Sequence, residues 1–289
     1  MLAVMPLLST TAMAQDAADQ QESEVEKYWK FPGSSALKYT QSFYSDNWYK
    51  GGVNNHTLLV NLSQDANYAK DRLIFENKLE ARLGYYTTKD NDDNTVLKIN
   101  DDLLRLTSKL GIKAVKDWYY SAQLQGYTQF MNVYEDDNAT LKSEFFAPVY
   151  ATFSLGMDYK PTFDNDKISL SVQLSPVAYN CRYVRDVRLG PNFGIEEGKK
   201  FKQSIGSSAE ANIKWNFWKS LTWTGKAQFF TSYHNIEANF ENTLDYAFNK
   251  FFAIQLFVHW RFDDSVAPDP KLDYNQFKEF LTLNFTYSW

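Results

Sequence analysis

A run of fifteen residues in which apolar and charged side chains alternate limits most strongly how this chain can fold. Residues 72–86 read RLIFENKLEARLGYY, and one alternate set is apolar except for Asn77. The other set carries the charged residues Glu76, Lys78, Glu80 and Arg82. A β-strand sends alternate side chains to opposite faces, and strands of soluble proteins usually have only about 5–6 residues. A strand that crosses a bilayer at a tilt needs roughly 9–11 residues, so the run predicts a membrane-spanning strand.

The same alternation recurs twelve times in the chain. The segments lie at about residues 34–45, 55–69, 72–86, 103–115, 118–134, 147–159, 168–175, 205–217, 221–229, 237–248, 252–262 and 281–289. Single-chain bacterial barrels have an even number of strands, with short periplasmic turns and longer outer loops. Connections after even segments are short here. Most others are longer, with a polar loop expected at 88–101 and the longest irregular span at 180–203; only the connection at 234–236 is unexpectedly short.

We therefore expect an all-β fold, a transmembrane antiparallel up-and-down β-barrel of 12 strands with both termini periplasmic. Composition agrees with this expectation. The sequence contains no run of 18 apolar residues and therefore predicts no membrane-spanning helix. Its 17% aromatic content fits the aromatic belts at two membrane interfaces. The net charge of −5, without a basic cluster in the sequence, argues against nucleic acid. The expected location is the outer membrane of a Gram-negative bacterium.

The two ends of the chain carry export and insertion features. Residues 1–14 resemble a signal peptide that ends in Ala12-Met13-Ala14, although the basic region is missing, and a disordered apolar N-terminus is the alternative. Residues 15–33 are expected to be a flexible periplasmic segment, and 34–289 the barrel. The last strand alternates Phe285, Tyr287 and Trp289, which predicts recognition by the barrel-insertion machinery. Outer-membrane lipids and lipopolysaccharide are the other expected partners.

The inward face of the predicted barrel is the first candidate for function. Its charged residues are Glu76, Lys78, Glu80, Arg82, Arg105, Lys109, Lys113, Glu241, Asp245 and Arg261. One interpretation is a charged lining that selects solutes; the other is a salt-bridged filling that closes the lumen. Barrels of about eight strands are filled, whereas 16–18 strands leave a channel. Both signs occur on neighbouring strands and buried charges must be paired, so we favour the filling. Lys226 and Arg261 are the expected partners of the acids near Glu241.

Catalytic and metal-binding patterns are weak. A serine nucleophile needs a histidine base, and none of His56, His234 and His259 has a serine at a suggestive position. Asp90-x-Asp92-x-Asn94 with Asp101 loosely follows a calcium loop, but the sixth place is Thr95 rather than glycine. We expect no enzyme activity, cofactor or dedicated metal site. Acidic outer loops that bind divalent cations weakly stay an open alternative.

A set of short motifs resembles a known family along most of the chain. The motifs include Gln41, Trp48-x-x-Gly51-Gly52-x-Asn54, Asp102-Leu103-x-x-Leu106-x-Ser108-Lys109-Leu110-Gly111, Phe145-x-Ala147-Pro148, Leu155-Gly156-x-x-Tyr159-x-Pro161, Phe262-Asp263-Asp264 and Gln276-x-Lys278-Glu279. They are similar to outer-membrane barrels of Bacteroidetes that are described only as a domain of unknown function. The resemblance implies a barrel in the outer membrane and brings no ligand or activity.

The turn motif Trp48, Gly51, Gly52 and Asn54 has two interpretations. Glycine permits positive φ and close backbone approach, so the motif is either a tight bend with an interfacial tryptophan or a docking point for another outer-membrane protein. Together these features predict a barrel with a largely plugged lumen that serves as a structural or accessory subunit. A narrow channel or transporter for small solutes is the alternative, and an outer-membrane enzyme is a third hypothesis.

Overall fold

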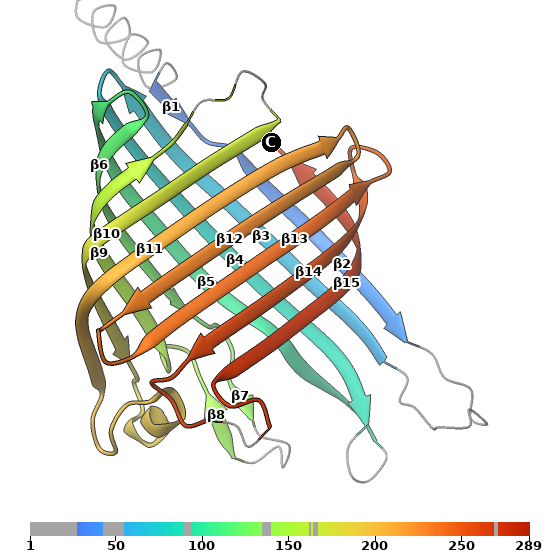
Figure 1. Cartoon of the computed structure of the whole chain (residues 1–289). Coiled ribbons are helices and arrows are strands. Elements are labelled where there is room, and N and C mark those ends of the chain that lie inside the picture. The colour runs from blue at the N-terminus through green and yellow to red at the C-terminus, as the bar shows by residue number, and fades with distance from the viewer. Residues whose placement is uncertain are drawn as a thin grey trace, which may run out of the picture.

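Twelve antiparallel strands form the wall of a closed barrel, which confirms the predicted fold (Figure 1). The computed structural model describes residues 28–42, 55–89, 94–134, 140–161, 163, 167–268 and 271–289. The wall strands are β2 (Gly33–Ser42), β3 (Asn55–Lys70), β4 (Leu73–Lys89), β5 (Thr95–Val115), β6 (Trp118–Thr128), β9 (Val149–Tyr159), β10 (Ile168–Tyr183), β11 (Phe201–Trp218), β12 (Leu221–Thr231), β13 (Ile236–Ala247), β14 (Phe252–Asp263) and β15 (Asn275–Ser288). Each strand pairs with the next along the chain, and β15 pairs with β2 to close the barrel.

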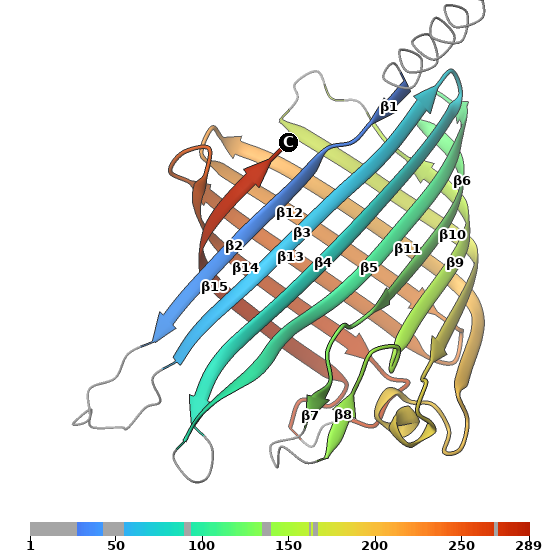
Figure 2. The same ribbon diagram turned by 180° about the vertical axis from the view of Figure 1, so that it is seen from behind.

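The two ends of the barrel differ. We call the end with the short turns after β3, β5, β9, β11 and β13 the turn end, and the opposite end the loop end. Figures 1 and 2 show that β1 (Trp29–Lys30) and the C-terminus both lie at the turn end. There the chain is closed by reciprocal backbone hydrogen bonds between Gly33 and Trp289, at N···O distances of 3.0 and 3.1 Å.

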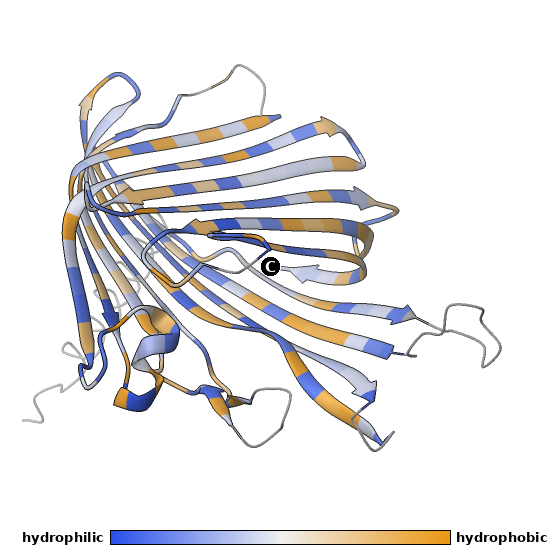
Figure 3. Cartoon of the chain, turned by 60° about the horizontal axis from the view of Figure 1, so that its bottom comes forward, coloured by the Kyte–Doolittle hydropathy of each residue, from blue (hydrophilic) through white to orange (hydrophobic). Residues whose placement is uncertain are grey.

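The outer face of the wall is apolar. Apolar and polar residues alternate along the strands (Figure 3), and the outward leucines, phenylalanines and valines are largely exposed, as Leu106 and Leu281 are. Six of the seven described tryptophans lie near the turn end: Trp29, Trp118, Trp215, Trp218, Trp223 and Trp289. Such a ring fits a membrane interface. A closed barrel with an apolar outer belt is the form in which β-strands can cross a bilayer, and the protein is an outer-membrane barrel of a Gram-negative bacterium.

No helix among the residues that the structure describes is long and apolar enough to cross a membrane.

Strand β10 corrects the predicted irregular span at 180–203. The strand continues to Tyr183, and a bulge between Ser175 and Ala178 shifts its register against both β9 and β11. Because the bulge adds one residue, inward positions change from odd to even numbers. The alternation therefore breaks at Pro176 although the strand does not, and Arg182 is directed into the lumen.

Other boundaries also differ from prediction. Strand β4 ends at Lys89 and β5 already begins at Thr95. Most of the polar loop expected at 88–101 therefore belongs to a hairpin of these two strands. Strand β6 ends at Thr128, and a short hairpin of β7 (Val133–Tyr134) and β8 (Leu141–Ser143) follows. Residues 28–33, expected to belong to the flexible segment, are structured. Trp29 pairs with Tyr68 in the backbone ladder between β1 and β3, and their rings also pack 5.2 Å apart. The predicted signal peptide and residues 15–27 lie outside the described residues.

The loop end is covered by a small core of its own. Val184, Leu189 and Ile195 are buried around Ala147, and Leu189 lies in the 3₁₀ helix η1 (Val187–Phe193). Asp186 caps η1 by accepting a hydrogen bond from the Arg188 amide. The Arg188 guanidinium also donates to Asp186 and lowers the pKa of its carboxyl to about 2. Burial of these apolar side chains holds the β10–β11 connection over the end of the lumen.

Candidate functional site

A wide vestibule occupies the turn-end half of the lumen. Its volume is about 1240 Å³, and polar side chains from every wall strand except β9 and polar residues of the turns line most of it. The lining includes Glu76, Lys78, Glu80 and Arg82 of β4, together with Arg105, Lys109, Glu241 and Asp245. These eight members of the predicted lumen charges therefore lie at the vestibule. Beyond the vestibule lie two small cavities of about 70 and 10 Å³.

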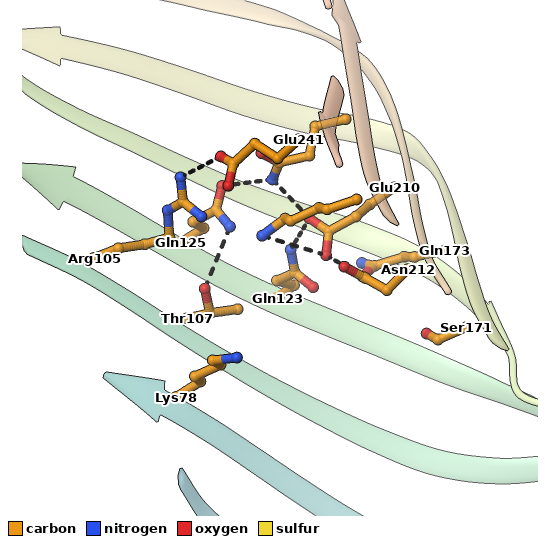
Figure 4. Close-up of polar contacts among 12 residues, drawn as sticks. Lys78, Arg105, Thr107, Gln123, Gln125, Ser171, Gln173, Glu210, Asn212 and Glu241 are labelled. Carbon is orange, nitrogen blue, oxygen red and sulfur yellow. Dashed lines mark hydrogen bonds and ion pairs between the residues drawn. The ribbon is translucent and has the colours of Figure 1, made fainter. Parts of the chain in front are cut away.

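An ion pair crosses the full width of the barrel where the vestibule ends. Arg105 on β5 donates to Glu241 on β13 at 2.7 Å, and these strands lie six places apart in the ring of twelve. The same guanidinium lies 3.5 Å from Glu80 on the neighbouring strand β4. Figure 4 shows Arg105 and Glu241 meeting from opposite walls. The two side chains therefore bridge the middle of the lumen between diametrically placed strands.

Hydrogen-bonded amide side chains lie next to this ion pair and extend the contact across the lumen. Gln125 on β6 donates to Thr107 at 3.3 Å and accepts from Gln228 on β12 at 2.9 Å. Gln228 also donates to Glu210 at 2.8 Å, and Gln123 reaches the same carboxylate at 3.3 Å (Figure 4). We call this layer, with the Arg105–Glu241 pair, the septum.

The carboxylate of Glu210 is the centre of the septum. Asn212 donates to it at 2.8 Å, Lys226 lies 4.0 Å away, and the two glutamines complete its partners. A buried carboxylate needs such compensation because its desolvation is costly. The 70 Å³ cavity beside it is lined mainly by amides and hydroxyls, and the side-chain oxygens of Gln123 and Gln173 have no protein partner. At roughly 10–15 Å³ per water, a polar cavity of this volume has room for a few water molecules.

A second charged layer lies between the septum and the loop end. Arg182 is 1% exposed, makes ion pairs with Glu237 and with Asp263, the latter at 3.0 Å, and donates to the Phe193 carbonyl at 3.1 Å. Asp263 also accepts from Arg261 at 2.7 Å. The stacked rings of Tyr127 and Tyr150, 4.7 Å apart, lie beneath these guanidinium groups. This layer ties β10 and β14 to the loop that carries η1.

Some predicted partnerships are wrong. Lys226 and Arg261 do not form ion pairs with Glu237, Glu241 or Asp245; Lys226 faces Glu210, and Arg261 pairs with Asp263. Instead, Asp245 accepts a hydrogen bond from Gln255, which in turn accepts one from Lys38. Asp245 thus has its partner on the neighbouring strand β14, whereas Glu237 and Glu241 pair with arginines of non-neighbouring strands, because a closed barrel brings distant parts of its wall within side-chain reach.

Other charged residues are distributed along the wall. Lys109 lies 3.2 Å from the fully buried Asp158, Lys160 pairs with Glu76, and Lys78 lies 3.8 Å from Glu80. Arg82 faces Asp101 at 3.4 Å. Lys113 is exposed at the turn end rather than buried in the lumen.

Sequence reasoning assigned no role to the septum glutamines, and in the second charged layer it assigned Arg261 to the lumen but gave no role to Arg182 or Asp263. The inward parity of Gln123, Gln125 and Gln228 was visible in the sequence. The inward position of Arg182 could not be recognised, because the bulge in β10 reverses the alternation before it.

Asp101 argues against the calcium-loop hypothesis. It lies within β5, where Arg82 and Lys278 compensate its charge, with Lys278 at 2.9 Å. Asp90 and Asp92 lie outside the described residues. Within the described ranges, no group of three histidine, cysteine or acidic residues is arranged to hold a metal ion.

The described histidines have structural contacts. His56 Nδ1 lies 2.8 Å from the Tyr39 hydroxyl on the outer face, and His259 lies 3.3 Å from Asn239. His234 contacts a backbone carbonyl. None of these contacts is with a serine hydroxyl. The absence of enzyme activity stays a prediction.

The remaining predicted sites lie at the membrane surface. Phe285, Tyr287 and Trp289 are exposed on the outer face, and the Trp289 indole donates to Gln64 at 3.2 Å. Their role in insertion stays a prediction. The turn motif Trp48, Gly51, Gly52 and Asn54 lies outside the described residues.

Comparison with known proteins gives one family match. Residues 39–134 match a family described as a protein of unknown function (DUF3078), in agreement with the predicted likeness to a domain of unknown function. No curated protein matches the chain.

Solved structures of barrels are similar over most of the chain. An outer-membrane channel (COG4313) of Pseudomonas putida F1 is 14% identical with a TM-score of 0.40, covering 89% of this chain and 94% of that one. The translocator domain of the autotransporter NalP from Neisseria meningitidis is 9% identical with a TM-score of 0.33, covering 96% and 97%. The NanC porin is 7% identical with a TM-score of 0.35, covering 88% and 97%. At these values the similarities say nothing about a solute or partner of this chain.

Proposed function

We propose that the barrel is closed by its septum and acts as a structural or accessory subunit of an outer-membrane assembly. The observation that carries this proposal is the direct contact between Arg105 and Glu241 on diametrically placed strands. The glutamine chain and the layer around Arg182 lie behind it. A buried arginine held by two carboxylates is costly to displace, which favours a permanent filling over a plug that moves readily.

A narrow channel for small polar solutes is the second candidate. It is favoured by the vestibule of about 1240 Å³, which reaches the septum from the turn end. Beside the charged groups of the septum, the contacts of Gln125 with Thr107 and Gln228 join uncharged side chains, and a local rearrangement of these would open a path. The two candidates make opposite predictions for conductance.

Conductance in planar bilayers tests the proposal. The wild-type barrel is expected to show no steady conductance above the empty bilayer. A variant in which serine replaces Arg105, Gln125, Gln228 and Glu241 together should give steady single-channel currents. The shortened side chains no longer meet across the lumen, so the septum should open.

A matched control removes an ion pair outside the lumen. Lys199 and Glu196 form an exposed ion pair at the loop end. Replacing both residues by serine should give no conductance above that of the empty bilayer. Steady conductance by the wild-type protein would overturn the closed-septum proposal and favour the channel.

The accessory role is tested separately by affinity capture from outer membranes. If the Trp48 motif is a docking point, Trp48→Ala should release partners that the wild-type protein retains. An unchanged partner set would count against that motif as the contact.

A further inference from the structure

The seam between β15 and β2, where the barrel closes, is paired over only part of its length. Its ladder comprises six residue pairs and ends where Leu283 lies opposite Tyr39, whereas every other pair of neighbouring wall strands shares at least ten. Strand β15 stays paired with β14 as far as Asn275, and β2 stays paired with β3 as far as Ser42. Both strands therefore continue toward the loop end after they have stopped pairing with each other. Figures 1 and 2 show them meeting beside the C-terminus and separating toward the loop end.

The pairing is lost between residues that the structure describes. The register of the seam, continued by one step, would place Thr40 opposite Thr282. The next step would place Gln41 opposite Leu281. All four residues belong to strands, yet neither pair is formed. Instead the Thr40 hydroxyl donates to the Leu281 carbonyl at 3.0 Å, so a side chain takes the place of a backbone donor at the point where the strands separate.

The separation leaves residues 275–282 of β15 without a partner strand on the β2 side among the described residues, and we call them the open edge. Alternate residues of a strand direct their backbone groups to the same side, so the Leu281 carbonyl places the groups of the odd-numbered residues on this edge. The side chains of Leu281 and Phe277 are 63% and 62% exposed, against 50% for Leu283 in the paired part. The open edge thus belongs to the apolar outer face that contacts the bilayer.

From the lumen side, the open edge is held by β5 and β14. Lys278 donates to the Asn100 carbonyl at 3.1 Å and to Asp101 at 2.9 Å. The ring of Phe280 stacks on that of Phe257, with centroids 6.3 Å apart. These contacts fix the edge in position, but they lie inside the lumen and do not cover backbone groups that are directed along the wall. The edge is therefore preorganised for a neighbour in the wall.

The chemistry of the open edge selects a polypeptide as that neighbour. Backbone groups in the hydrocarbon region need hydrogen-bond partners because no water is available there. Acyl chains offer none, whereas an extended peptide supplies donors and acceptors along a sheet edge. Polar side chains also flank the edge on the outer face, namely those of Glu279, Gln41 and His56. The Tyr39 hydroxyl joins the latter two at 3.1 and 2.8 Å. Such groups fit a protein neighbour better than lipid tails.

We propose that the open edge of β15 is the docking site for an extended strand of another outer-membrane protein. The backbone groups of Phe277, Glu279 and Leu281 pair with that strand. The inference rests on the proposed accessory role and names the surface that serves it. It does not depend on whether the septum conducts.

Site-specific photocross-linking in intact cells tests the proposal. The full chain carries p-benzoylphenylalanine in place of Phe277, Glu279 or Leu281, and mass spectrometry locates the linked residue. A paired strand predicts a register: each step of two residues along β15 should move the link by two residues within one segment of the partner. Phe201, which is 51% exposed at the loop end of β11, is the control site and should not link to that segment.

The other occupants of the edge give different links. Links to lipid alone, to residues 43–54 of this chain or to a second copy would overturn the proposal, and so would links without a register or no links at all. If affinity capture retains a partner while these links are absent, the accessory role stands and only the docking site is wrong. If capture retains no partner either, the accessory role fails as well.

A disulfide that closes the seam gives a second readout. In a Cys181→Ser background, T40C/T282C joins the strands at a non-hydrogen-bonded pair of the continued register, where a Cα separation of about 4.5 Å suits a disulfide. Oxidation should lower the yield of the links about tenfold, because β2 then occupies the edge, and dithiothreitol should restore them. The control A36C/T286C, in the paired part of the seam, should keep the links when it is oxidised. Unchanged links in oxidised T40C/T282C would overturn the proposal.

Discussion

Among single residues, Arg182 shows how far a buried charge can organise this barrel. Its guanidinium is almost fully buried and joins Glu237, Asp263 and the Phe193 carbonyl. Removing one member of a buried charged network leaves the others desolvated and unpaired, which costs more than the network contributes as a whole. Arg182 should therefore affect stability strongly.

We expect Arg182→Met to lower the free energy of unfolding by about 3–5 kcal/mol. The measurement is urea unfolding in micelles, followed by tryptophan fluorescence. Adding Glu237→Gln and Asp263→Asn should recover part of the loss, since no buried carboxylate then lacks a partner. Arg188→Met is the control, because that exposed arginine pairs only with Asp186, and it should change little. Equal effects at the two arginines would contradict the role of burial.

At the scale of elements, two glycines in the strands next to the β10 bulge allow wall strands to approach closely, Gly156 toward β10 and Gly206 toward β12. A Cβ at Gly156 of β9 would lie 2.0 Å from the Leu174 carbonyl oxygen, and a Cβ at Gly206 of β11 would lie 1.8 Å from that of Thr231. Backbone atoms cannot move aside as a flexible side chain does, so these strands pack closely only because both residues lack a Cβ.

Alanine at Gly156 or Gly206 is expected to destabilise the barrel by about 1–3 kcal/mol through overpacking. Gly126 is a matched control in β6, because its nearest atom would lie 3.8 Å from an added Cβ. Gly126→Ala should stay within about 0.5 kcal/mol of the wild type. Urea midpoints of the three variants, read by heat-dependent gel mobility, check this prediction. Similar midpoints for all three would show that the strands can shift to admit a methyl group.

For the whole molecule, the asymmetry of the two ends predicts an orientation. Outer-membrane barrels have short periplasmic turns and longer outer loops, and both β1 and the C-terminus lie at the turn end here. We therefore expect the turn end to face the periplasm.

Cysteine labelling in intact cells checks this orientation. In a Cys181→Ser background, a cysteine in place of Glu197 at the loop end should react with a membrane-impermeant maleimide. A cysteine in place of Lys219 at the turn end should react only after the outer membrane is permeabilised. The reverse pattern would show that the barrel is inserted the other way.

Alternation alone determined the class of fold, the number of wall strands and the face of most side chains. This works because a strand has a period of two and a bilayer rewards an apolar exterior. Residues 72–86 were recognisable as a strand for this reason, and their charged residues Glu76, Lys78, Glu80 and Arg82 line the vestibule. The limits of β10 were not recognisable, because one extra residue at Pro176 reverses the parity of everything that follows it.

The tertiary structure decided which inward charges meet. Neighbouring residues in the sequence, or on adjacent strands, suggested Lys226 and Arg261 as partners of the acids near Glu241. Closure of the barrel brought Arg105 instead, from six strands away. That contact depends on the curvature and register of the whole wall, which no single segment encodes. The physical reason is that the side of the wall to which a side chain points is set locally within each strand. Which charged side chains meet across the lumen is set by the geometry of the whole closed barrel.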